Sequence, residues 1–181
     1  MPTPQYNEAK LKEMILYIAL VSEDDPHMGS TKLNKALFYA DFLHYLETGN
    51  AISGAEYQRN KHGPTPRRLV PAQDALVKAG AAAYKKVAHQ WDAEQNRFVV
   101  LQRPNLSIFS AEEIATIDRV LRILRPLTGT EAENRSHEFI GWDIAAEGET
   151  IPYAVVAVPN APIPLTSGES EWAADVSRRA A

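Results

Sequence analysis

Cysteine is absent from the 181 residues, so the chain can form neither a disulfide bond nor a thiolate metal site. No apolar run approaches the ~20 residues that a membrane-spanning helix needs. Residues 1–14 are polar where a secretory signal peptide would carry an apolar stretch. The net charge of -4 argues against the whole surface binding phosphate groups, although it permits a local basic face. We therefore expect a cytoplasmic protein with no membrane partner.

The signatures of common enzymes are also missing. The sequence contains no glycine-rich phosphate-binding loop, no nucleophile elbow and no HExxH pair. Asp41 and His44 are spaced to share a helix face, as a general acid–base pair would, but a pair that joins two helices is commoner. His137 could be a metal ligand, but packing against Trp142 is the simpler interpretation. The sequence thus predicts no catalytic residue, no metal site and no cofactor.

The apolar pattern predicts an α+β fold. The length fits one domain, and the 45% apolar content is ordinary for a globular protein. Residues 6–21 have helical spacing, and Ser30 is a candidate N-cap for a second helix that ends near Gly49. That second helix is apolar on two faces, so we expect it to be central and buried. The predicted architecture is a mainly helical single domain around this helix, with a small antiparallel hairpin that would make a winged-helix-like element.

The middle of the chain alternates between turns and extended segments. Residues 55–61 could form a short strand, and residues 62–66 a rigid turn because each proline fixes φ. Thr65 and Pro66 resemble the N-cap and first position of a third helix that would run toward Gly80. Residues 83–103 have the pattern of a β-hairpin whose polar loop would span residues 92–96.

Helix-start signals dominate the last third. Ser110 and Glu113 have the spacing of a capping box, which predicts a helix that Pro126 closes. Thr130 and Glu133 repeat that spacing and would open a short helix to about residue 139. Residues 151–158 have an extended pattern. We expect the domain to cover residues 1–159 and a partly flexible or short-helical tail to cover residues 160–181.

Positive charge is concentrated in one part of this acidic chain. Residues 56–90 hold seven lysines and arginines against two acidic residues. A helix followed by a basic hairpin is what a winged helix presents to DNA, but the same charge would serve an acidic protein, and a solvated face is a further alternative. The predicted partner-binding residues are Arg59, Lys61, His62, Arg67, Arg68, Lys85 and Lys86.

Residues 31–69 carry a resemblance to a known family. The run KLNKALFYADFLH at residues 32–44 resembles the Lys-Leu-x-Lys-Leu-Leu-Tyr-Tyr-Ala helix of the Panacea antitoxin domain family, the SocA-like and phage-associated proteins. A Gly-Pro turn, the helix at residues 110–124 and a His…Trp element follow in the family's order. The sequence departs from the pattern at Ala36 and at Thr65-Pro66. The matching motif positions are Lys32, Leu33, Lys35, Leu37, Tyr39, Gly63, Pro64, His137 and Trp142.

The resemblance implies an antitoxin that neutralises a cognate toxin, usually encoded beside it, by direct protein–protein binding. The alternative is a DNA-binding transcriptional regulator that uses the basic residues 59–86, and a homodimer is a further candidate assembly. A stiff turn at residues 63–66 would lower the entropy cost of fixing an interface loop. Candidate aromatic contacts are Tyr57, Tyr84, Trp142 and Trp172, of which Trp142 better suits the core.

Overall fold

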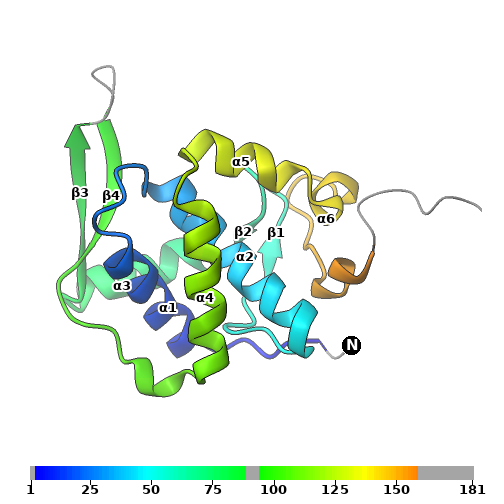
Figure 1. The fold of residues 1–181 in the computed structure, drawn as a ribbon, viewed down its shortest axis with the longest axis horizontal. Coiled ribbons are helices and arrows are strands. Elements are labelled where there is room, and N and C mark those ends of the chain that lie inside the picture. Colours follow the sequence, from blue (N-terminus) through cyan, green and yellow to red (C-terminus); the bar gives the residue numbers. More distant parts are fainter. Residues whose placement is uncertain (1–2, 89–93, 159–181) are drawn as a thin grey trace, which may run out of the picture.

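The predicted α+β, mainly helical class is confirmed (Figure 1). The computed structural model describes residues 3–88 and 94–158, so the predicted tail lies outside the described residues. The helices are α1 (Glu8–Val21), α2 (Ser30–Thr48), α3 (Leu69–Lys78), α4 (Ala111–Leu124), α5 (Gly129–His137) and α6 (Ile140–Ile144). The strands are β1 (Tyr57–Gln58), β2 (Thr65–Pro66), β3 (Ala82–Ala88) and β4 (Glu94–Val100), and the 3-10 helices are η2 (Leu106–Ile108) and η3 (Tyr153–Ala157).

Helix α2 is the central element, as the two apolar faces predicted. It contacts α1, α4, α5, β2, β4 and η3, and Figure 1 shows it crossing the middle of the molecule behind α4. Leu37 on one face and Phe38 and Phe42 on the other are buried. Burial of this kind removes apolar surface from water on both sides of one helix, which is the main stabilising term for such a domain.

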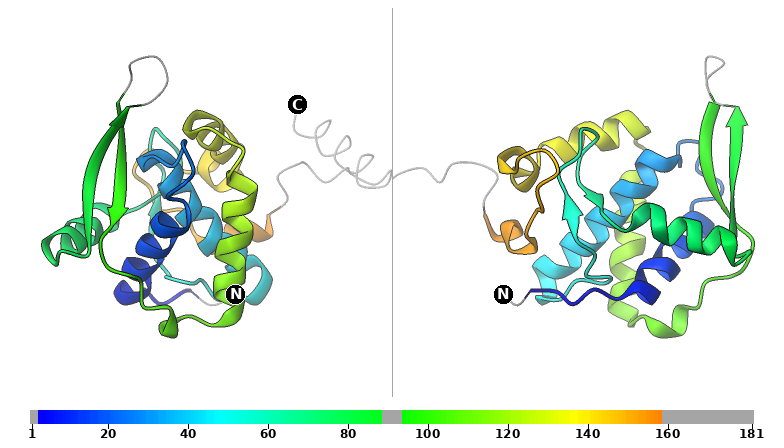
Figure 2. Two further views of the ribbon diagram at one scale, coloured as in Figure 1. Left: turned by 60° about the vertical axis from the view of Figure 1, so that its left-hand side comes forward. Right: turned by 180° about the vertical axis from the view of Figure 1, so that it is seen from behind.

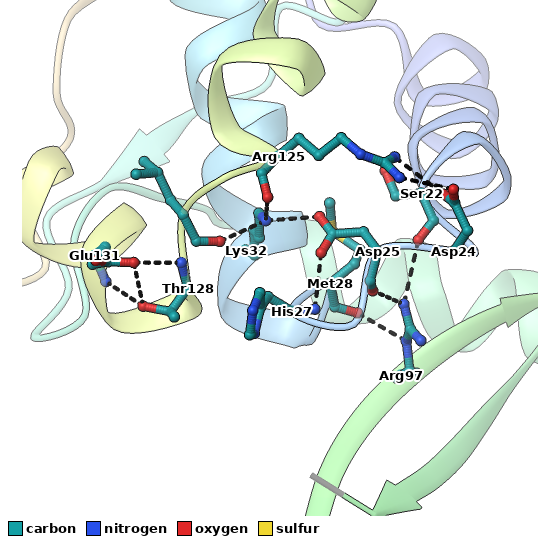
Figure 3. A network of polar contacts seen from close by, with 11 residues as sticks. Ser22, Asp24, Asp25, His27, Met28, Lys32, Arg97, Arg125, Thr128 and Glu131 are labelled. Atoms are coloured by element: carbon teal, nitrogen blue, oxygen red, sulfur yellow. Dashed lines mark hydrogen bonds and ion pairs between the residues drawn. The ribbon is translucent and has the colours of Figure 1, made fainter. Parts of the chain in front are cut away.

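A buried lysine on α2 joins segments from both halves of the chain (Figure 3). The Lys32 side chain is fully buried, and its Nζ lies 2.7 Å from Asp25 Oδ2. The same Nζ donates to the carbonyl oxygens of Arg125 at 3.1 Å and Leu127 at 2.6 Å. An ammonium group has three hydrogens to donate, so these three acceptors satisfy it. The contacts fix the loop before α2 against the segment that joins α4 to α5.

The predicted β-hairpin is confirmed, and it is attached to that same loop. Strands β3 and β4 pair antiparallel with Ala82 opposite Val100. Arg97 on β4 donates to the carbonyl oxygens of Ser22, Asp25 and Met28 (Figure 3). Figure 2 shows the hairpin standing at one end of the molecule.

Two predicted N-caps are wrong, because tertiary contacts take the side chains. Helix α2 is capped by Gly29, and the Ser30 hydroxyl instead donates to the Asn96 carbonyl at 3.2 Å. Thr65 and Pro66 form β2 and pair antiparallel with β1, so they do not begin a helix. Helix α3 begins at Leu69, and Pro71 lies in its first turn, where the missing N–H has no helical partner to lose.

Further along the chain, one predicted capping box is confirmed and another is displaced. The Ser110–Glu113 box starts α4. The second box is Thr128–Glu131, two residues before the predicted pair, and it starts α5.

Two extended or loop assignments also need correction. Glu94 to Asn96 belong to β4, so the predicted loop at residues 92–96 is wrong. Residues 153–157 form η3, not the predicted extended segment, and the pairing with β1 is made just before it, by Thr150 and the Ile151 amide.

Replacement of Leu37 by aspartate should unfold the domain. Leu37 is fully buried on α2, and a carboxylate in apolar surroundings costs several kcal/mol, a large part of a domain's total stability. Circular dichroism should show loss of cooperative thermal unfolding. Leu46→Asp is the matched control because Leu46 lies on the same helix and is 47% exposed. A cooperatively melting Leu37→Asp protein would mean that the core lies elsewhere.

Candidate partner-binding surface

The predicted basic residues fall into two separate groups. Arg59, Lys61 and His62 lie next to β1 and its turn, with Arg67 and Arg68 after β2, while Lys85 and Lys86 lie on β3. Figures 1 and 2 show the hairpin at one end of the molecule, apart from the β1–β2 pair. The structure therefore does not bring the seven side chains onto one continuous surface.

Several of these cations are already engaged within the domain. Arg67 pairs with Glu56 at 2.6 Å and donates to the Gln58 side chain at 2.6 Å and to the Gly148 carbonyl at 2.6 Å. The hydrogen bond from Thr150 to Glu56 holds the pKa of that carboxyl below its usual value, and Arg67 adds to the effect. Arg67 thus braces β1 against residues 148–150. These contacts reduce the charge left for a phosphate backbone.

Two more of the predicted residues, Lys86 and His62, lie beside acidic side chains. Lys86 pairs with Glu94 across the hairpin at 2.7 Å, with both side chains exposed, and His62 Nδ1 lies 2.9 Å from Glu133 Oε1. Lys61, Arg68 and Lys85 remain exposed. Exposed pairs of this kind contribute little to stability. The three exposed cations give the surface a modest local positive character.

Arg59 and His137 both stack on Trp142. The Arg59 guanidinium carbon lies 4.5 Å from the centre of the Trp142 ring, and the His137 ring lies 4.0 Å from it, nearly parallel. Trp142 Nε1 donates to the Asn60 carbonyl at 3.0 Å. Burial lowers the pKa of His137, which favours its neutral form. The predicted packing of His137 against Trp142 is confirmed, and residues 3–88 and 94–158 contain no group of three metal-ligating side chains.

A second buried lysine binds the Gly-Pro turn from the interior of the domain. Lys35 is fully buried, and its Nζ donates to the His62 carbonyl and, at 3.5 Å, to the Pro64 carbonyl. Desolvation by burial lowers the pKa of Lys35 to about 8. Gly63 has φ +91°, and a Cβ there would lie 2.3 Å from Ser136 Oγ and 2.4 Å from Lys35 Nζ. Only glycine satisfies both the backbone conformation and the space.

This arrangement corrects the expectation that the stiff turn faces a partner. Gly63, Pro64 and Pro66 are buried and Thr65 is half-buried, so the prolines are packed into the domain. The turn is rigid because Lys35 binds it from inside. Tyr57 is fully buried and cannot contact a partner, while Tyr84 is 49% exposed and can. Trp172 lies outside the described residues.

Asp41 and His44 do not form an acid–base pair. Asp41 is fully buried and accepts hydrogen bonds from the Ser53 amide at 2.7 Å and the Tyr57 hydroxyl at 2.9 Å. Desolvation raises the pKa of Asp41, and these donors oppose the rise. His44 Nδ1 instead lies 3.2 Å from Thr116 Oγ1 on α4. Both side chains therefore connect α2 to its neighbours, which favours the structural interpretation.

An apolar groove is the surface feature that the sequence analysis missed. It lies between α2, α4, α5 and η3 and has a volume of about 500 Å³. Phe38, Phe42 and Phe139 line its interior, and Leu46 and Ile123 line it where they are 47% and 45% exposed. The available signal was weak: Ile123 lies off the buried stripe of α4, but apolar residues exposed singly are common.

Comparison with known proteins identifies the domain type. Residues 33–143 match the family model described as "Antitoxin SocA-like, Panacea domain". The match begins within α2 and ends within α6, and it includes Lys35 with the Gly-Pro turn that it binds and the His137–Trp142 stack. No curated protein and no solved structure gives a significant match. In the part of the chain that the structure describes, no helix is long and apolar enough to cross a membrane.

Replacement of Gly63 by alanine should destabilise the domain more than the same change at Gly80. Both glycines have positive φ, so both variants carry the left-handed backbone cost of roughly 1–2 kcal/mol. Only Gly63→Ala also forces a Cβ against Ser136 and Lys35, which adds about 1–3 kcal/mol of overpacking. Urea unfolding measures both. Equal losses would show that the close approach at Gly63 has no energetic weight.

The pH dependence of stability should report on Lys35. Because the folded-state pKa is about 8 and the unfolded value is 10.5, the unfolded chain binds more protons at this position between these values. The contribution of Lys35 to stability should therefore rise with pH through this window, and it should be lost as the pH falls from 10.5 to about 8. Urea unfolding of wild type and Lys35→Met should show the rise only in wild type. Lys78→Met, which removes an exposed lysine, controls for the loss of one charge and should keep it.

Proposed function

Because the chain belongs to the SocA-like antitoxin family with a Panacea domain, we propose that it neutralises a cognate toxin by direct protein–protein binding. The observation that carries the proposal is the match over residues 33–143, which covers more than half of the chain. The family points to a protein partner and a non-enzymatic role. We further propose that the domain extends over residues 1–159, with residues 160–181 as an accessory tail, and that the encounter takes place in the cytoplasm.

The contacts inside the matched region support binding over catalysis. Lys35 donates to backbone carbonyls, Asp41 accepts from the segment at residues 53–57, and His137 stacks on Trp142. Side chains of these types can serve in catalysis, but here Lys35 and Asp41 bind backbone groups and His137 packs against an aromatic ring. The result is a preorganised body, and a preorganised binder spends less conformational entropy on association.

The basic residues remain a proposed contact region. Lys61, Arg68 and Lys85 carry exposed charge, which would speed the encounter with an acidic partner surface. The division of the basic residues between the turn and the hairpin gives no specific support to the DNA-binding alternative, so we do not propose it.

Co-expression tests the proposed function. A neighbouring small open reading frame, expressed alone from an inducible promoter, should arrest growth, and expression of this chain should relieve the arrest. The two purified proteins should then elute as one complex in size-exclusion chromatography, with the toxin's mass unchanged. Relief of arrest with a covalently modified toxin and no complex would instead indicate an enzyme. Failure to relieve any such arrest would contradict the antitoxin assignment.

A further inference from the structure

The apolar groove between α2, α4, α5 and η3 has the properties of a binding site. Phe38 and Phe42 in its wall are buried, but the groove also exposes Leu46, Ile123 and Val158, each 45–47% accessible. Its volume of about 500 Å³ admits a few side chains but not a folded domain. A concave apolar site with a few polar groups at its edge is the usual form of a binding site.

One polar side chain in the groove lining, Tyr39, lacks a hydrogen-bond partner of its own. The Tyr39 hydroxyl is buried and has no hydrogen-bond partner among residues 3–88 and 94–158. An unsatisfied buried hydroxyl is costly, so a shift of the neighbouring side chains that let an acceptor reach this atom would be favourable. Burial also raises the pKa of Tyr39 to about 12, which keeps the hydroxyl protonated and able to donate.

Arg135 places a positive charge at the edge of the groove. It lines the groove from α5, is exposed, and forms no ion pair with an acidic side chain in the described part of the chain. Arg119 on α4 differs, because it pairs with Glu47 at 2.5 Å. The free guanidinium of Arg135 therefore favours an occupant with a carboxylate, and it disfavours one with a cation at that position.

We infer that this groove binds a segment of the toxin that carries apolar side chains beside a carboxylate. The apolar side chains fill the space between α2 and α4, and the carboxylate pairs with Arg135. This is the docking of a short anchored segment into a preformed groove, where the apolar contacts give affinity and the charge fixes the orientation. The inference rests on the proposed antitoxin function and adds the surface and the chemistry of the partner.

Substitutions on the exposed lining test the inference without disturbing the core. Leu46→Glu and Ile123→Glu place charge in the groove, and Arg135→Glu reverses its sign. Each should weaken toxin binding at least ~tenfold in isothermal titration calorimetry and reduce relief of growth arrest. Val70→Glu on α3 is the matched control, because Val70 is 61% exposed and does not line the groove, and it should bind as wild type does. Cooperative thermal unfolding of each variant confirms that it is folded.

A charge-reversal cycle tests direct contact with Arg135. A toxin with one carboxylate changed to lysine should bind wild type weakly and should regain affinity with Arg135→Glu. Scanning the toxin's acidic residues finds this position. A complete scan with no rescuing pair would overturn the assigned chemistry of the partner.

The remaining outcomes separate the groove from the proposed function. Wild-type affinity in all three groove variants, with neutralisation intact, overturns the groove while the antitoxin function stands. A loss of binding seen only with Lys61→Glu or Arg68→Glu would place the interface at the basic turn. That result also overturns the groove and leaves the antitoxin function standing. If the groove variants change only self-association in light scattering, the occupant is a second copy, and the inference is wrong. A wild-type chain that binds and neutralises no toxin contradicts the proposed function itself.

Discussion

The arrangement of the domain depends on one constraint, the burial of the Lys32 ammonium group between α2, the loop before it and the α4–α5 connection. A buried charge is tolerated only where hydrogen bonds replace its water, and here one carboxylate and two backbone carbonyls do so. The acceptors come from the loop before α2 and from the α4–α5 connection. Those two segments must therefore meet at the same point for the folded state to exist at all.

The same solution recurs along α2 with different segments. Lys35, one turn on, binds the carbonyls around Gly63, and Asp41 binds the segment that leads into β1. The apolar faces of α2 hold the other helices, while its polar side chains hold the irregular segments. Hydrophobic burial is non-directional, whereas these hydrogen bonds specify one conformation for each loop. The three-residue spacing of Lys32 and Lys35 has this physical meaning here.

Sequence patterns predicted the elements whose signals are local. The two apolar faces of α2, the alternation in the hairpin and the Ser110–Glu113 box were sufficient, because each depends on neighbouring residues. The Thr65-Pro66 pair was misassigned because its strand pairing depends on partners seven and nine residues away. Thr128 and Thr130 both have a glutamate three residues on, so spacing alone could not choose between them.

The candidate site was harder to predict for a related reason. Lys32 and Lys35 look like solvent-exposed residues of a helix, and only the assembled fold shows that they are buried. The predicted basic residues appear as one group in the chain but occupy two places in space. The groove depends on the relative placement of four elements, which no local pattern encodes. The resemblance could be recognised in residues 32–44 because that stretch is the central helix, where Lys32, Lys35 and Leu37 are buried.

Asp25 links the central helix to the hairpin, because its side chain and its backbone bind different elements. Its carboxylate binds Lys32, while its backbone carbonyl accepts from Arg97 on the hairpin. The hairpin and the central helix are thus fastened to one residue of an eight-residue connection between α1 and α2. An exchange of hairpins between related domains would therefore have to carry this connection with it. The two segments thus form a single structural unit, although α2, β1, β2 and α3 lie between them in the chain.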